Sequence, residues 1–166
     1  FFIVFVFLIA CAEPQGTQQR AAPPAKLGAS VEVSGGTITG NVREDGLHEY
    51  LGIPYAAPPV GNLRWRPPQP AAQWNEVKLA DTPGPACMQP ARAPRSLFPD
   101  PFERKSEDCL YLNVWTTADQ GDDHPVMVWF HGGGFAILTG NTKAFNNTSL
   151  PAEGTIVVTV NHRLGP

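Results

Sequence analysis

One short segment constrains the fold of this chain more than any other. Five apolar residues, Val126 to Phe130, are followed by His131 and by three glycines, Gly132 to Gly134. The β-branched and aromatic run is typical of a β-strand that is buried on both faces of a sheet. Glycines directly after a strand form a loop whose backbone can approach a ligand closely, because no Cβ stands in the way. We therefore expect a ligand-facing loop here, with a plain flexible turn as the alternative.

The composition excludes several classes of function. The chain has 166 residues and a net charge of −3, so it can form one ordinary domain but carries no basic cluster for nucleic acid. No cysteines and histidines are spaced as metal ligands, and we expect neither a metal nor another cofactor. The histidines are scattered, at His48, His124, His131 and His162.

The N-terminal segment has the character of an export signal. Residues 1–10 are all apolar, a run too short to cross a bilayer as a helix but suited to the hydrophobic region of a signal peptide. Leu8–Cys11 resembles a bacterial lipobox, so we expect residues 1–11 to be a signal-peptide remnant and Cys11 to be lipidated. The protein would then be secreted or periplasmic, and its only membrane contact would be a lipid anchor. The alternative is the tail of a transmembrane anchor followed by an ordinary cysteine.

The rest of the chain is predicted to form a disordered tether followed by a β-rich domain. Residues 12–28 are mostly Gln, Pro and Ala and offer little to bury, which predicts the tether. Residues 29–166 contain alternating or β-branched runs that predict strands, and only weak helix signals between Gly140 and Glu153. The predicted strands are Val31–Ser34 and Thr37–Gly40, joined as a hairpin by Gly35-Gly36, then His48–Ile53, Cys109–Trp115, Val126–Phe130 and Thr155–Val160.

Two features lie between these strands. A proline-rich stretch contains Trp65 and Trp74, which we expect to pack against the domain's own core rather than to serve as a ligand for another domain. With Cys11 lipidated, Cys87 and Cys109 form an even pair in an oxidising compartment, which favours a disulfide. A buried free thiol is the alternative.

Five segments resemble the type-B carboxylesterase family, which also contains the cholinesterases. Glu107–Val114 is similar to the family's second signature, and the other four follow the family's order from about Val31 to Pro166. These are Tyr50–Ala56, Pro58–Trp65, His131–Phe135 and Val157–Gly165.

The resemblance implies an α/β class and the N-terminal portion of an α/β-hydrolase fold. A small antiparallel region would lead into the first strands of a large mixed sheet. It implies that Gly133 and Gly134 donate backbone N–H groups to an oxyanion hole, that Cys87 pairs with Cys109, and that Glu107 forms a buried ion pair with Arg64. The competing interpretation of Glu107 and its neighbour Asp108 is a catalytic carboxylate pair.

The sequence departs from the family in two places. The cholinesterases hold a quaternary ammonium group on a tryptophan in the disulfide loop. The loop between Cys87 and Cys109 contains no tryptophan, and its aromatic residues are Phe98 and Phe102, so we do not expect a choline ester as substrate. His162 stands where the family usually carries an aromatic hydroxyl.

The nucleophile of such an enzyme is missing from this sequence. An α/β-hydrolase uses Ser in a G-x-S-x-G motif, followed along the chain by an acid and a His, and none of the five serines has that context. We expect an N-terminal fragment of an esterase that cleaves small carboxylic esters through a Ser acyl-enzyme and that is inactive by itself. The alternatives are a non-catalytic adhesion or binding member of the family, and a truncated product that does not fold stably. The serines are Ser30, Ser34, Ser96, Ser106 and Ser149.

Overall fold

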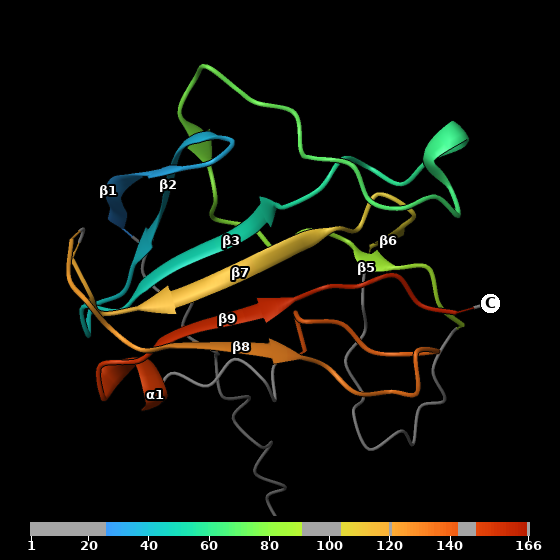
Figure 1. The fold of residues 1–166 in the computed structure, drawn as a ribbon. Coiled ribbons are helices and arrows are strands. Elements are labelled where there is room, and N and C mark those ends of the chain that lie inside the picture. Colours follow the sequence, from blue (N-terminus) through green and yellow to red (C-terminus); the bar gives the residue numbers. More distant parts are fainter. Residues whose placement is uncertain (1–25, 91–103, 120, 143–148, 166) are drawn as a thin grey trace, which may run out of the picture.

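The fold is a mixed β-sheet with little helix, seen in a computed structural model that describes residues 26–90, 104–119, 121–142 and 149–165 (Figure 1). The predicted signal remnant and Cys11 lie outside these residues, as does most of the predicted tether. The strands are β1 (Lys26–Val33), β2 (Gly36–Val42), β3 (His48–Pro54), β4 (Lys78–Leu79), β5 (Ala86–Cys87), β6 (Lys105–Ser106), β7 (Tyr111–Thr116), β8 (Val126–Phe130) and β9 (Ile156–Val160). A 3-10 turn covers Gly61–Leu63, and α1 covers Ser149–Ala152.

The main sheet has the order β1-β2-β3-β7-β9-β8, with β4 added beside β2. From β1 to β9 the neighbours along this order are antiparallel, and β8 is parallel to β9. Figure 1 shows the antiparallel hairpin at one edge and β8 with β9 at the other. The change to parallel pairing sends the ends of β8 and β9 in the same direction, so the loops after Phe130 and Val160 meet.

The hairpin at the start of the sheet confirms one prediction and corrects two boundaries. Val33 pairs directly with Gly36, so the turn residues are Ser34 and Gly35 rather than the two glycines. The tether was expected to reach Gly28, but β1 begins at Lys26, which pairs with Val42. Backbone pairing with β2 extends the strand there, and backbone pairing leaves no signal in the composition, which is why composition placed the start too late.

The two tryptophans of the proline-rich stretch behave differently. Trp74 packs against the core beneath the hairpin, and its indole Nε1–H donates to the carbonyl of Thr37 at 2.8 Å. Trp65 has a positive φ of 61° and is 70% exposed, so the prediction that it packs on the core is wrong for the part of the chain described.

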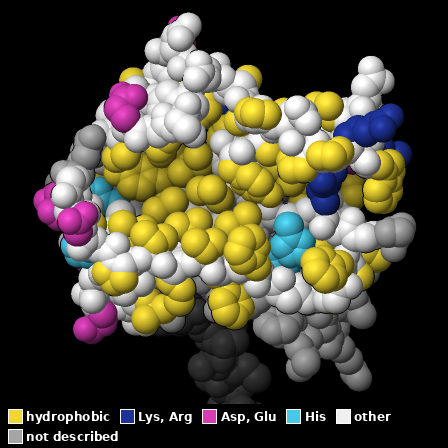
Figure 2. Space-filling model, viewed as in Figure 1, with side chains coloured by type: hydrophobic (Ala, Val, Ile, Leu, Met, Phe, Trp, Pro, Cys, Tyr) yellow, Lys and Arg dark blue, Asp and Glu magenta, His cyan; other side chains and the backbone are white. Residues whose placement is uncertain are grey.

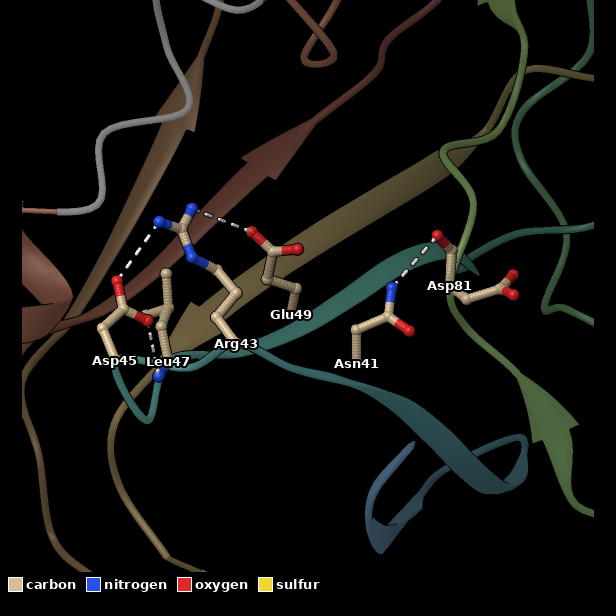
Figure 3. A network of polar contacts seen from close by, with 6 residues as sticks. All are labelled: Asn41, Arg43, Asp45, Leu47, Glu49 and Asp81. Atoms are coloured by element: carbon tan, nitrogen blue, oxygen red, sulfur yellow. Dashed lines mark hydrogen bonds and ion pairs between the residues drawn. The ribbon is translucent and has the colours of Figure 1, made fainter. Parts of the chain in front are cut away.

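The turn between β2 and β3 is held by polar contacts (Figure 3). Arg43 lies 3.2 Å from Asp45 and 3.6 Å from Glu49, and the Asp45 carboxylate accepts the N–H of Leu47 at 3.2 Å. The Asn41 side chain donates to the carbonyl of Asp81, tying the hairpin to the strand region around β4. These groups are partly exposed, so their role is to order the turn rather than to bind a ligand.

Three small hydrophobic clusters form the core. One lies under the hairpin and β3 around Ile38, Tyr50 and Ile53, and a second joins Trp115 of β7 to Val157 of β9. The third surrounds the cysteines and includes Ala56 and Leu110. The first two clusters pack against β7 and its neighbours β3 and β9. The cysteine cluster contacts Leu164, in the segment after β9.

β8 is a strand as predicted, but its predicted burial is wrong. All five of its residues are exposed, Phe130 to 65%. Among the described strands β8 pairs with β9 alone, and no described element covers its two faces. Figure 2 shows hydrophobic side chains gathered in a broad area over the sheet on this side of the molecule. The apolar sequence of β8 indicates that the strand favours burial, but whether it is buried depends on which elements pack against it.

Helix is scarce, as the weak signals after Gly140 indicated. α1 has four residues, and it lies against the start of β9 (Figure 1). In the described ranges, we find no helix with the length and hydropathy needed to cross a membrane.

Candidate functional site

The loop after β8 has an unusual backbone. Gly133, Gly134 and Phe135 follow one another with positive φ values of 108°, 61° and 57°. The carbonyl of Gly133 accepts two N–H groups from further along, that of Ala136 at 3.1 Å and that of Ile137 at 3.3 Å. The loop is therefore a turn closed by backbone hydrogen bonds.

The three glycines differ in how strongly the fold requires them. A Cβ on Gly133 would lie 2.1 Å from the carbonyl oxygen of Ile137, a contact that real side chains essentially never make. A Cβ on Gly132 or Gly134 would meet nothing within 4 Å. Gly133 is thus required by both conformation and space, Gly134 by conformation alone, and Gly132 by neither.

The N–H groups of Gly133 and Gly134 have no acceptor within the described chain. None of the described backbone or side-chain hydrogen bonds uses either N–H as a donor. Consecutive backbone N–H groups in a left-handed turn are a recurrent way to bind an anion or a developing negative charge. The arrangement can therefore stabilise an oxyanion.

A cavity of about 590 Å³ lies beside this loop. Phe130 and His131 contribute to it from the end of β8, Phe135 from the glycine turn, and His162 and Arg163 from the segment after β9. The meeting of the parallel strand ends thus produces a hollow lined by the residues on either side of the glycine turn, His131 and Phe135, whereas Gly133 and Gly134 do not line it. The remaining lining residues are Tyr55, Pro68 and Leu110.

Two histidines stack at the wall of this cavity. The rings of His131 and His162 are 4.2 Å apart between centroids and 13° from parallel. Burial lowers the pKa of His131, and the charge of a protonated His162 lowers it further, whereas the hydrogen bond to the Gly132 carbonyl raises it. His131 is therefore favoured as a neutral imidazole.

The side chain of Asn161 anchors the far end of the glycine loop. It is buried, its Oδ1 accepts the Thr139 hydroxyl at 2.6 Å and the Gly140 N–H at 2.8 Å, and its Nδ2 donates to the carbonyl of Pro85 at 3.1 Å. Sequence reasoning missed this residue, because its three partners, Gly140, Thr139 and Pro85, lie 21, 22 and 76 residues before it in the chain.

The structure contains the disulfide between Cys87 and Cys109, with Cα atoms 5.0 Å apart. Arg64 Nε lies 2.6 Å from Glu107 Oε1, but the two side chains are 58% and 38% exposed, so the expected burial of this pair is wrong in the described structure. Both residues line a second cavity of about 360 Å³ beside the disulfide.

The interpretation of Glu107 and Asp108 as a catalytic carboxylate pair gains no support from the geometry. Glu107 is engaged with Arg64, and Asp108 accepts the hydroxyl of Tyr111 at 3.1 Å. No group of three His, Cys, Asp or Glu among the described residues could hold a metal ion. The loop residues Phe98 and Phe102 lie outside the described residues, as does Ser96.

Comparison with known proteins identifies the family. Residues 28–166 match the model of the carboxylesterase family. The chain belongs to this family. It is 44% identical over 124 residues to the para-nitrobenzyl esterase of Bacillus subtilis, covering 74% of this chain and 25% of that protein. It is 41% identical over 133 residues to the phenmedipham hydrolase of Pseudarthrobacter oxydans, covering 76% of this chain and 26% of that protein.

Solved carboxylesterase structures confirm the fold expected from the family. A para-nitrobenzyl esterase superposes with a TM-score of 0.74 at 40% identity, over 82% of this chain and 28% of that one. A carboxylesterase of Geobacillus stearothermophilus gives a TM-score of 0.72 at 36% identity, over 82% of this chain and 27% of that one. The chain thus has an α/β-hydrolase fold and spans about a quarter of the length of these relatives.

Proposed function

We propose that this carboxylesterase-family chain is the N-terminal part of a carboxylic ester hydrolase, in which Gly133 and Gly134 supply oxyanion-hole donors. The observation that carries the proposal is the pair of consecutive N–H groups, without acceptors in the described chain, in a turn whose flanking residues His131 and Phe135 line a cavity of about 590 Å³. The two hydrogen bonds to the Gly133 carbonyl would hold the turn in this conformation before any substrate arrives.

The proposed chemistry follows from where charge develops. Attack of a serine on an ester carbonyl converts the carbonyl oxygen into an alkoxide, and preorganised N–H groups stabilise this anion more than the neutral ester. Removing one such donor typically costs about 100- to 1000-fold in rate. The resulting acyl-enzyme is then hydrolysed by water, which regenerates the serine.

The nucleophile, acid and base would come from a more C-terminal part of the complete esterase. In this fold a further oxyanion donor is the N–H of the residue after the nucleophile, so this chain would supply only part of the hole. The proposal predicts that the 166-residue chain is inactive by itself. The proposed substrate class is a small carboxylic ester, which agrees with the name of one relative, para-nitrobenzyl esterase.

Expression of the complete reading frame tests this proposal. The product should release p-nitrophenol from p-nitrophenyl acetate at a saturable rate and form a covalent adduct with an organophosphate on a serine of a G-x-S-x-G motif. The purified 166-residue chain should show only the buffer rate. A complete product without that serine and without turnover would instead support a non-catalytic binding member of the family.

We also propose that the protein is exported and lipid-anchored through Cys11. Support comes from the apolar run at residues 1–10 and from the Cys87–Cys109 disulfide, since such bonds persist in oxidising compartments. In a bacterial host, the complete product should partition with membranes, and the Cys11→Ala variant should lose the diacylglyceryl mass on its N-terminal peptide. An unmodified Cys11 in the mature protein would contradict the lipid anchor.

A further inference from the structure

A glutamine beside the disulfide makes a reciprocal contact with the oxyanion turn. The side chain of Gln89 accepts the N–H of Leu138 through Oε1 at 2.9 Å and donates to the carbonyl of Leu138 through Nε2 at 2.9 Å. The same Nε2 donates to the carbonyl of Cys87 at 3.2 Å. A side-chain amide thus pairs with both backbone groups of one residue, as a neighbouring strand would.

Leu138 needs such a partner. It is buried and has a positive φ of 85°, which is strained for a leucine. Its N–H and its carbonyl are both bound by Gln89, and 49 residues separate the two positions in the sequence. Without the amide, two polar backbone groups of a buried residue would lose their partners, and the strained conformation would lose its support.

Leu138 is linked to Gly133 through the residue between them in the turn, Ile137. Ile137, the residue before it, donates its N–H to the carbonyl of Gly133, and the Ile137 carbonyl oxygen occupies the space that a Cβ on Gly133 would need. A change in the backbone at Leu138 must therefore move Ile137 against Gly133. At the other end, Gln89 lies two residues from Cys87 of the disulfide, and its own carbonyl accepts Lys105 Nζ at 3.0 Å.

We propose that Gln89 is a positioning residue for the oxyanion turn, which transmits the rigidity of the Cys87–Cys109 disulfide through Leu138 to the N–H groups of Gly133 and Gly134. The catalytic consequence rests on the proposed function, whereas the structural coupling does not. In this proposal Gln89, which lines the cavity of about 360 Å³ beside the disulfide, acts through Leu138 and not on the reacting atoms. It acts by holding the donors at the position where the oxyanion forms.

The first test is independent of activity. In the complete protein, Gln89→Ala should increase amide hydrogen exchange at Leu138 about 10-fold or more and shift the amide resonances of Gly133 and Gly134. The matched control is Gln69→Ala, because Gln69 is exposed and its side chain makes one hydrogen bond, to the nearby Pro67 carbonyl. Unchanged Gly133 and Gly134 resonances in a folded Gln89→Ala variant would overturn the coupling.

The second test uses a near-isosteric change in the complete esterase. A carboxylate at position 89 can still accept the Leu138 N–H but cannot donate to the Leu138 carbonyl, and a protonated carboxyl group can donate again. Gln89→Glu should therefore lower kcat about 10-fold at pH 8 with KM nearly unchanged, since misplaced donors weaken the transition state rather than ground-state binding. The ratio of its kcat to that of the parent should rise as the pH falls, whereas Gln69→Glu should keep a ratio near one.

The outcomes separate the two proposals. A constant ratio for Gln89→Glu across pH, or an effect confined to KM, contradicts the positioning role. A complete product that hydrolyses no ester contradicts the proposed function alone, and the amide exchange at Leu138 still decides the coupling.

Discussion

The imidazole rings of His131 and His162 lie face to face, 4.2 Å apart between centroids, at the junction of the loops that follow β8 and β9. His131 is buried, whereas His162 also contacts Phe135 edge-on at 5.6 Å between centroids. Two imidazolium ions at this distance would repel each other, so the stack is stable when at least one ring is neutral. The site therefore contains a pH-sensitive contact.

Stability should decrease at acidic pH because of His131. Its pKa is lowered in the folded state, chiefly by burial, so the unfolded chain binds the proton more tightly than the folded chain. The contribution is fully present above the ordinary histidine pKa of about 6.5 and is lost as the pH falls from there towards the lowered value. Urea denaturation between pH 5 and about 8 measures the slope. His131→Asn should flatten it, and an equally steep slope in that variant would assign the effect to other groups.

The buried amide of Asn161 should be among the most sensitive positions of the fold. Asn161→Leu removes the acceptor of Thr139 and Gly140 and the donor to Pro85, which should lower the free energy of unfolding by about 2–4 kcal/mol. Asn161→Asp keeps the acceptor but can donate to Pro85 only when its carboxyl group is protonated, so its loss should become smaller as the pH falls, unlike that of Asn161→Leu. Chemical denaturation of the two variants at several pH values compares them, and a loss in Asn161→Asp that does not change with pH would contradict a role for the donated hydrogen bond.

Removal of the disulfide should destabilise the chain measurably. The bond joins residues 22 apart in sequence, and closing a loop of this length is worth about 3 kcal/mol in the chain-entropy model. The Cys87→Ser, Cys109→Ser double variant should lose roughly this amount of unfolding free energy in urea denaturation. A loss below about 1 kcal/mol would indicate that the unfolded chain is already constrained in this region.

Much of the sheet could be predicted because its strands have strong local patterns. The alternation in β7 and the β-branched run in β9 both indicate strands, and the glycines after Phe130 indicate a special turn. The burial of β8 could not be predicted, since a residue pattern does not reveal which faces are covered. The pairing of Cys87 with Cys109 followed from the count of cysteines and from the family.

The supports of the candidate site could not be predicted at all. Gln89 and Asn161 are single polar residues without a local pattern, and their partners in the segment after the glycine turn lie 49 residues and 21 to 22 residues away in the chain. Such contacts become visible only once the fold brings the segments together. The family resemblance indicated the glycine turn, and the structure adds the side chains that contact the segment after it, Gln89 at Leu138 and Asn161 at Gly140.

The catalytic rate of the glycine variants tests the central claim most directly. In the complete esterase, kcat/KM for p-nitrophenyl acetate should fall at least about 100-fold in Gly133→Ala, since its Cβ would displace the turn and with it the donors. Gly132→Ala is the matched control, because a Cβ there meets nothing within 4 Å, and it should retain the parent's rate within a few-fold. Equal rates for the two variants, both near that of the parent and with both proteins folded, would contradict an oxyanion hole at Gly133 and Gly134.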